Sequence, residues 1–306
     1  MFIRVIHRTW GRLTNKSLRI VNYINKYSKR VENSLSNSTS LLMDNEIFIR
    51  LGIFFLAFAA LAMLEQIIPR RSEEASKGSR LRTNWSFIII DSFFLKLLAF
   101  AIPLLAIGAA VDAKANSIGI LNLFDWPIVI EFILSILILD FAIWVQHLVT
   151  HKIPFLWRVH QVHHSDPEFD VSTAIRFHPI EIVLSMLFKV GLVYLLGPSA
   201  LAVLIFEILL NASAMFNHAN IKIPPKLEKF LRLFIVTPDM HRIHHSSDRS
   251  EHDTNYGFAL SIWDKLFGTY KVEPNLSHQE MEVGLKWQND KPTKFWWSIW
   301  LPFRNK

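Results

Sequence analysis

The sequence of 306 residues contains no cysteine, which excludes disulfide bonds and thiolate metal ligands. Any metal ion must therefore be bound through nitrogen and oxygen atoms. The sequence also lacks an H-E-x-x-H motif, which argues against a metalloprotease of that class. No G-x-G-x-x-G motif is present, so nothing indicates a dinucleotide-binding domain.

Acidic residues are absent from the first part of the chain, where none precedes Glu32, whereas Arg4, Arg8 and Arg12 follow at helical spacing. We therefore predict that residues 1–46 form a basic amphipathic arm lying on anionic lipid. An Arg-rich organelle transit peptide is the alternative. Basic segments beside a membrane also explain the net charge of +7, so no nucleic-acid partner is expected.

Apolar residues make up 51% of the chain and the mean hydropathy is +0.26, values that indicate a membrane protein. We predict an all-α integral membrane protein with about four to five transmembrane helices and a cytoplasmic, histidine-rich helical cap. The five apolar stretches are Ile47–Ile68, Phe93–Val111, Trp126–Val145, Ile180–Leu196 and Pro198–Met215. Charged residues interrupt the second and the fourth of them.

The chain is accordingly divided into four parts. The basic arm is followed by membrane helices at 47–137, by a histidine-rich region at 138–272 that includes two further membrane helices, and by a tail at 273–306. The tail ends in KFWWSIWLPFRNK, where tryptophans and basic residues are mixed. This composition is typical of an anchor at the membrane interface, and a partner-binding helix is the alternative.

Basic residues are unevenly distributed between the first two connecting segments. Five lie between Arg70 and Arg82, whereas residues 112–125 carry only Lys114. The first connection should therefore be cytoplasmic and the second should lie outside. This orientation places the histidine-bearing ends of the later spans on the cytoplasmic side. The same orientation places the basic arm of residues 1–46 outside, which conflicts with the preference of positive residues for the cytoplasmic side. A re-entrant second segment would remove this conflict.

The histidines follow two repeated patterns. WVQHLVTHKIPFLWRVHQVHH runs from Trp144 to His164 and MHRIHHS from Met240 to Ser246, and each contains H-x-x-H-H. On a helix, positions i, i+3 and i+4 share one face, so each motif is expected to aim three imidazoles in one direction. The pattern predicts a metal site built from His147, His151, His160, His163, His164, His241, His244 and His245.

Ligand type does not identify the metal, since neutral imidazole binds iron, zinc, copper or nickel. Ligand number is more informative, because eight or nine imidazoles exceed the needs of one four-coordinate zinc and indicate two metal ions. Clustered triplets are not expected of bis-histidine haem. A metal carrier is the main alternative to an enzyme, although transporters place their ligands near the bilayer midplane.

Two spans carry polar residues on the face that leads to the histidines. Asp140 shares a face with His147 and is predicted to accept a hydrogen bond from a ligating imidazole. Glu207, Asn211 and His218 share a face of the last span. Ionisable groups inside membrane helices are costly and usually functional. For Glu207 the alternative is a structural ion pair with Lys189.

Between about Asp140 and Tyr270 the chain resembles the fatty acid hydroxylase and sterol desaturase superfamily, in particular its bacterial and alkylglycerol monooxygenase-like members. The resemblance rests on the two histidine motifs together with further short segments. These segments are STAIRFHPIE from Ser172 to Glu181, NHAN around His218, PDMHRIHHS from Pro238 to Ser246, DTNYG from Asp253 to Gly257 and WDKLFGT from Trp263 to Thr269.

The resemblance implies metal-ligand roles for the eight histidines above and for His218 as a ninth. His178 matches sterol-type members only, so it is either an additional ligand or a residue that orients ligands or begins a helix. Asp140, Asp253 and Asn255 match positions expected to orient ligands or to line the cluster.

The chemistry implied is that of two non-haem iron ions that use O₂ to hydroxylate an unactivated C–H bond of a fatty acyl, alkyl or sterol chain. Desaturation at the same centre is the alternative, and a non-redox metal carrier is the alternative from another class. The implied partners are a lipid substrate, the membrane and an external electron donor of cytochrome b5, ferredoxin or pterin type.

Overall fold

The computed structural model describes residues 45–72, 77–101, 105–289 and 291–304. In these ranges all regular elements are helices, which confirms the predicted all-α class. The chain divides into two compact units, residues 1–50 and 51–306. The prediction of a basic arm falls almost entirely on residues 1–44, outside the described residues.

Four helices of the described chain are long and apolar enough to cross a membrane: α2 (Glu46–Ile67), α5 (Ile128–Lys152), α7 (Pro179–Leu196) and α8 (Ala200–His218). They correspond to four of the five predicted spans. Large apolar side chains such as Met63, Ile133, Leu184 and Leu209 are exposed on them. Surrounding lipid explains this exposure, because a soluble protein rarely leaves so much apolar surface uncovered.

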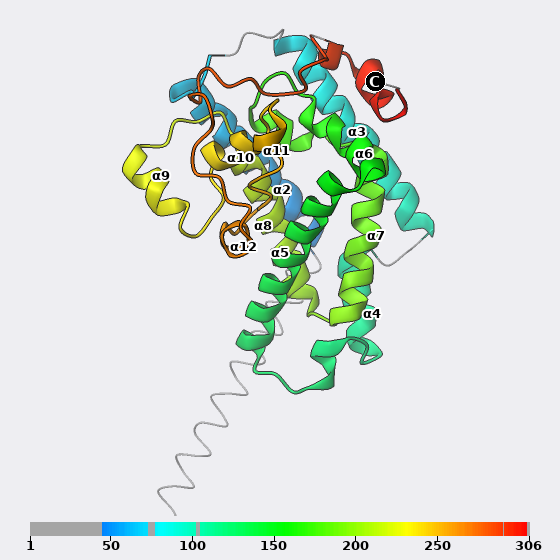
Figure 1. The fold of residues 1–306 in the computed structure, drawn as a ribbon. Coiled ribbons are helices and arrows are strands. Elements are labelled where there is room, and N and C mark those ends of the chain that lie inside the picture. Colours follow the sequence, from blue (N-terminus) through cyan, green and yellow to red (C-terminus); the bar gives the residue numbers. More distant parts are fainter. Residues whose placement is uncertain (1–44, 73–76, 102–104, 290, 305–306) are drawn as a thin grey trace, which may run out of the picture. The chain divides into compact units, whose positions relative to one another are not determined.

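The second predicted span, Phe93–Val111, is not one helix. The chain forms α3 (Lys77–Ala101) and α4 (Ala106–Ala115) instead. Lys96, and Asp91 just before the predicted stretch, lie inside the continuous helix α3 and do not divide it. In the sequence Pro103 stands between α3 and α4, and a proline disfavours a helix interior because it lacks the N–H donor. The two helices together lead the chain from the histidine end of the structure to the opposite end (Figure 1).

At the end opposite the histidines, the turn between α7 and α8 contains Gly197, which lies in close contact with Gly119. Gly197 ends α7 with φ 69°, and Gly119 adopts φ 101°. A Cβ atom on Gly119 would lie 2.3 Å from the backbone nitrogen of Gly197. Only glycine therefore fits at position 119, and the contact fixes the turn against the connection that follows α4.

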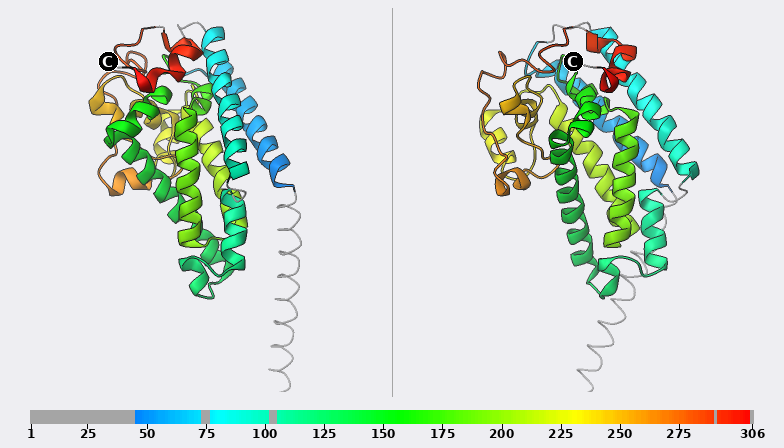
Figure 2. Two further views of the ribbon diagram at one scale, coloured as in Figure 1. Left: turned by 90° about the vertical axis from the view of Figure 1, so that its right-hand side faces the viewer. Right: turned by 45° about the vertical axis from the view of Figure 1, so that its right-hand side comes forward.

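At the other end, short helices cover the ends of the long ones (Figures 1 and 2). Helix α6 packs on α5, α10 packs on α8, and the C-terminal helices lie against α3 and α6. The short elements are α6 (Pro154–His164), η2 (Val171–Ile175), α9 (Pro225–Leu231), α10 (Pro238–His244), α11 (Arg249–His252), α12 (Ile262–Leu266), η3 (Lys291–Thr293), α13 (Phe295–Ile299) and η4 (Leu301–Phe303), whereas η1 (Ile120–Leu123) lies at the opposite end against α7.

Two buried arginines connect these elements behind the histidines. Arg80 of α3 forms ion pairs with Asp166, at 3.2 Å, and with Asp170. The guanidinium of Arg176 donates to the carbonyl oxygens of Val162 and Pro292, both at 2.9 Å. It also donates to Asn84, Ser165 and Ser298. Arg176 thereby joins α3, the end of α6 and the C-terminal segment.

Candidate metal centre

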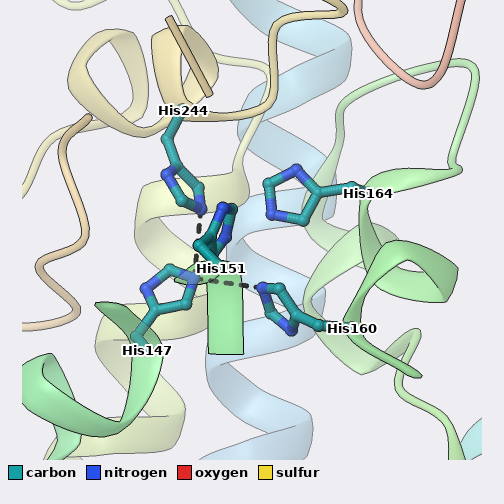
Figure 3. Close-up of side chains that lie close together, drawn as sticks. All are labelled: His147, His151, His160, His164 and His244. Carbon is teal, nitrogen blue, oxygen red and sulfur yellow. Dashed lines mark hydrogen bonds between the residues drawn. The ribbon is translucent and has the colours of Figure 1, made fainter. Parts of the chain in front are cut away.

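Nine histidines from separate segments of the chain form two adjacent groups. In each group, ligand nitrogens lie within 4.8 Å of one another. The first group, shown in Figure 3, comes from α5, α6 and α10. The second group comes from α6, α8 and α10 or the residue that follows it. The groups consist of His147, His151, His160, His164 and His244, and of His163, His218, His241 and His245.

Each H-x-x-H-H motif contributes to both groups, which differs from the expectation that its three imidazoles point together. In α6, His160 and His164 join the first group and His163 joins the second. In the second motif the division is reversed, because His241 and His245 join the second group and His244 joins the first. In each motif, the first and last histidines (positions i and i+4) therefore belong to one group, and the middle histidine (position i+3) belongs to the other. The arrangement ties the two groups into one centre.

Five of the nine imidazoles are oriented through hydrogen bonds from Nδ1. Backbone carbonyls of Tyr256, Arg176, Ala214 and Thr254 and the carboxylate of Glu181 can only accept, so in each case Nδ1 carries the proton and Nε2 keeps its lone pair. The bonds are His147 to Tyr256 at 2.7 Å, His160 to Glu181 at 2.6 Å, His163 to Arg176 at 3.2 Å, His218 to Ala214 at 2.6 Å and His244 to Thr254 at 2.7 Å.

The Nε2 atoms fixed in this way face one another. Nε2 of His147 lies 3.2 Å from Nε2 of His160 and 3.0 Å from that of His244. Nε2 of His218 lies 3.1 Å from that of His163. Two lone pairs at such distances repel, and a bound cation between them removes the repulsion. The donor set therefore fits metal ions held by imidazole nitrogen.

Other histidines of the two groups are buried with nitrogen atoms that have no hydrogen-bond partner. This holds for both ring nitrogens of His151 and His241 and for Nε2 of His164. A buried polar atom without a partner costs free energy, so each such atom requires an explanation. Metal coordination explains one such nitrogen of each imidazole, because each residue offers one ligand atom to its group.

The buried environment keeps the imidazoles outside the membrane-spanning helices in the neutral form that binds metals. Burial, followed by repulsion from neighbouring imidazoles, lowers the pKa of each well below the ordinary value. The residues concerned are His163, His164, His241, His244 and His245. They are therefore ready to bind a metal ion at neutral pH without first losing a proton.

The structure places His178 outside both groups. Its Nδ1 accepts from the backbone N–H of Ile180 at 3.2 Å, and its Nε2 donates to the carbonyl oxygen of Ile299 at 3.1 Å. Both ring nitrogens are therefore engaged in beginning α7 and in holding the C-terminal segment. This position corresponds to the second of its two expected roles, that of a residue at a helix start.

Asp140 does not contact an imidazole, which corrects the expectation from the shared helix face. Its Oδ2 accepts from Trp263 Nε1 at 2.7 Å. The physical reason is distance, because seven residues of helix separate Asp140 from His147 by about 10 Å. Asp140 instead fixes α12 against α5.

Asp253 and Asn255 both lie beside the centre, in different roles. Asp253 Oδ1 lies 3.6 Å from His151 Nδ1, and Asp253 also pairs with Lys152 at 3.1 Å. Asn255, at φ 52°, donates to the carbonyl oxygens of Met240 and Lys271, both at 3.0 Å. Asn255 therefore supports the backbone of α10, which carries the second motif.

Three residues near the centre were not assigned a role from the sequence. Glu181 orients His160, and a carboxylate at the start of a membrane span was the signal available for it. His252 lies with His151 and Asp253 in a third small group, and no spacing marked it. Asp264 accepts from the backbone N–H groups of Tyr256 and Gly257 at 2.9 and 2.8 Å, which positions the carbonyl that orients His147.

Asp264 is fully buried and also accepts from Trp144 Nε1 at 3.0 Å and from Thr269 Oγ1 at 2.6 Å. Replacing it with alanine leaves several buried donors without an acceptor, so Asp264→Ala should lower the free energy of unfolding by about 3 kcal/mol or more. Thermal unfolding in detergent measures the effect. Asp125→Ala, at an exposed position, serves as the control, and equal melting temperatures for the two variants would contradict the assignment.

A cavity of about 160 Å³ adjoins the first group. His147 and His160 line one part of it, and further residues of α5, α7 and α8 line the rest together with Ala174, Phe177 and Phe258. Phe177, Ile182, Leu210 and Phe258 supply apolar surface. A lipid segment that reaches the histidines from the side of the membrane spans would enter this space.

Comparison with known proteins identifies the histidine-bearing region. Residues 132–269 match the family model described as fatty acid hydroxylase, and all nine clustered histidines lie within this range. This match confirms the superfamily resemblance seen in the sequence motifs. No solved structure matches the chain at a significant level.

Similar curated proteins cover different shares of the chain. Ornithine lipid hydroxylase OlsE of Rhizobium tropici is 33% identical over 163 residues, which are 52% of this chain and 47% of that protein. Alkylglycerol monooxygenase of Homo sapiens is 33% identical over 139 residues, 44% of this chain and 29% of that protein. A cholesterol 25-hydroxylase-like protein of Danio rerio is 24% identical over 238 residues, 76% of this chain and 90% of that protein. The chain thus spans about half of the first relative and less than a third of the second.

Proposed function

Because residues 132–269 match the fatty acid hydroxylase family model, we propose that the protein is a membrane-bound lipid hydroxylase whose clustered histidines bind two iron ions. One observation supports this proposal most directly: imidazoles of the first group donate their Nδ1 protons to backbone or carboxylate oxygens, and their Nε2 atoms, which carry lone pairs, face one another. The two groups of nitrogens correspond to one metal ion each.

The choice of iron rests on the chemistry of the relatives together with the donor set. Imidazole nitrogen also suits zinc, but zinc has no redox chemistry, whereas hydroxylases and monooxygenases reduce O₂. First-group ligands would be His147, His151, His160, His164 and His244. Second-group ligands would be His163, His218, His241 and His245.

Iron bound in the two groups would supply the activation of O₂ for hydroxylation of an unactivated C–H bond. The protein contributes position and surroundings. Backbone carbonyls and Glu181 hold the imidazoles in the tautomer that presents Nε2, and burial keeps bulk water away from the groups. The adjoining cavity would hold the part of the lipid that reacts.

Hydroxylation is preferred to desaturation because the similar proteins are named as hydroxylases and monooxygenases. The substrate is proposed to be a lipid with an acyl, alkyl or sterol chain. The electrons are proposed to come from a separate carrier of cytochrome b5, ferredoxin or pterin type.

We propose that the histidine end faces the cytoplasm. The basic segment between α2 and α3 lies at this end, as the hydrogen bonds of Arg70 to Asn220 and Asp239 show. Positive residues beside membrane spans favour the cytoplasmic side. Reporter fusions after Lys152 and after Lys114 would test the orientation, since the two positions should report opposite sides.

The proposed function is tested by metal analysis combined with O₂ consumption. Purified protein reconstituted with ferrous iron should bind about two iron ions per chain and consume O₂ when a reductant and a lipid extract are both supplied. Removal of iron with a chelator should abolish consumption, and added iron should restore it. Transport of zinc or copper into vesicles without O₂ consumption would favour a metal carrier and overturn the proposal.

A further inference from the structure

The cavity beside the first histidine group is more polar than a space for a hydrocarbon chain needs to be. Gln146, Ser185, Lys189 and Asn211 line it, in addition to Glu181. All of these residues belong to α5, α7 or α8, the helices that are long and apolar enough to cross a membrane. Polar residues are costly there and usually mark a function.

The polar residues of α7 extend away from the histidines in a line. Glu181, Ser185 and Lys189 are spaced four residues apart, so they lie on one face of the helix. Glu181 contacts His160 at 2.6 Å and marks the histidine end. Lys189 comes eight residues later, which places its backbone about 12 Å further along the helix axis. The cavity therefore connects the centre to a polar position deeper among the spans.

Lys189 is held at that position by the last span. Its Nζ lies 2.8 Å from Glu207 Oε1 of α8, and both side chains are largely buried. The ion pair confirms the structural alternative considered for Glu207 from the sequence. Lys189 also lines the cavity, however, and its ammonium group has three N–H donors. It can therefore donate to a molecule in the cavity while it is paired with Glu207.

We propose that Lys189, positioned by Glu207, binds a neutral hydrogen-bonding group of the lipid substrate and thereby determines which carbon reaches the His147 and His160 end of the cavity. This inference rests on the proposed hydroxylase function. Lys189 is a specificity-determining residue in this account. The substrate class is a lipid that carries a hydroxyl, ester or amide group at a fixed separation from the carbon that is attacked.

A neutral group is favoured over an anionic one by the charges present. Glu207 balances the charge of Lys189, and Glu181 lies at the other end of the same cavity. An added anion would therefore meet no net positive charge in a region of low dielectric constant. A hydroxyl or an amide can accept from Lys189 and donate to Gln146 or Asn211, and an ester can accept from Lys189 or Ser185, without that cost.

The test uses two series of lipid analogues of equal chain length. In one series a single hydroxyl or ester group is moved along the chain by one methylene at a time, and the other series consists of plain alkanes. The variant is Lys189→Met combined with Glu207→Gln, because the double change leaves no unpaired charge among the spans. Tyr194→Phe is the control on the same helix, since Tyr194 bonds to Asp112 outside the cavity.

In the unmodified protein and in Tyr194→Phe, the hydroxylated carbon should shift with the polar group, at a constant separation from it. In the double variant the products should spread over several carbons, and kcat/KM for the polar analogues should fall about 10- to 100-fold. Conversion of the alkanes should change little. An unchanged product distribution in the double variant would overturn the proposal.

A binding measurement separates this inference from the proposed function. The thermal shift that each analogue causes can be measured without turnover, on detergent-purified protein. Polar analogues should raise Tm more than alkanes in the unmodified protein, and this difference should disappear in the double variant. Failure of all O₂-dependent conversion with the binding difference intact would refute only the hydroxylase assignment. Equal shifts in both proteins would refute the role of Lys189.

Discussion

Replacement of His163 by alanine should lower the iron content and the rate of lipid hydroxylation together. His163 donates from Nδ1 to the carbonyl oxygen of Arg176 and presents Nε2 at 3.1 Å from that of His218. Without His163 the second group keeps only three imidazoles. We expect iron content to fall from about two toward one per chain, and product formation to fall by at least about 100-fold, more than an orienting residue costs. Elemental analysis and product quantification by mass spectrometry measure both.

His278→Ala is the matched control, because it also removes a buried imidazole. Nε2 of His278 lies 3.7 Å from the Asp239 carboxylate, and His278 belongs to neither group. This variant should keep both iron ions and its activity, even if packing around Asp239 lowers its melting temperature. Equal losses of iron in the two variants would show that general damage, rather than loss of a ligand, causes the effect.

Replacement of Glu181 should weaken the centre without removing a ligand. Glu181 Oε1 accepts from His160 Nδ1 at 2.6 Å, which fixes the ring and raises the basicity of Nε2. Glu181→Leu should reduce iron affinity and activity by about 100-fold, and Glu181→Gln, which keeps an acceptor oxygen, by about 10-fold. Competition with a coloured chelator measures the affinity.

Glu280→Gln provides the comparison for a carboxylate outside the centre, since Glu280 is exposed and bonds to Ser277. It should bind iron as tightly as the unmodified protein. If Glu181→Leu also did so, the hydrogen bond from His160 would have no part in holding the metal.

Spacing along the chain predicted which histidines come together, because positions i, i+3 and i+4 are neighbours on any helix. It did not predict how they divide. Whether His163 joins His160 or His218 depends on the angle at which α6 meets α8 and α10, and that angle is set by loops and packing rather than by spacing. The exchange of partners between the two motifs was therefore visible only in three dimensions.

The helical class and four of the spans followed from hydropathy, since a long apolar run has few other solutions in lipid. The second span was wrong because hydropathy averages over residues, whereas a single proline, Pro103 in the sequence between α3 and α4, disfavours the interior of a helix. Asp140 was given an imidazole partner because a shared helix face indicates direction but not reach. Its actual partner, Trp263, lies more than a hundred residues later, and no local pattern connects the two.

The clamp around Arg176 has a consequence for the order in which the protein is assembled. The ribosome completes all nine clustered histidines before it adds Pro292 and Ser298, yet the guanidinium beneath His163 needs acceptors on both of those residues. Until they are added, the guanidinium of Arg176 lacks these two acceptors. Docking of the last segment over α3 and α6 is therefore a late step in the assembly of this end of the protein.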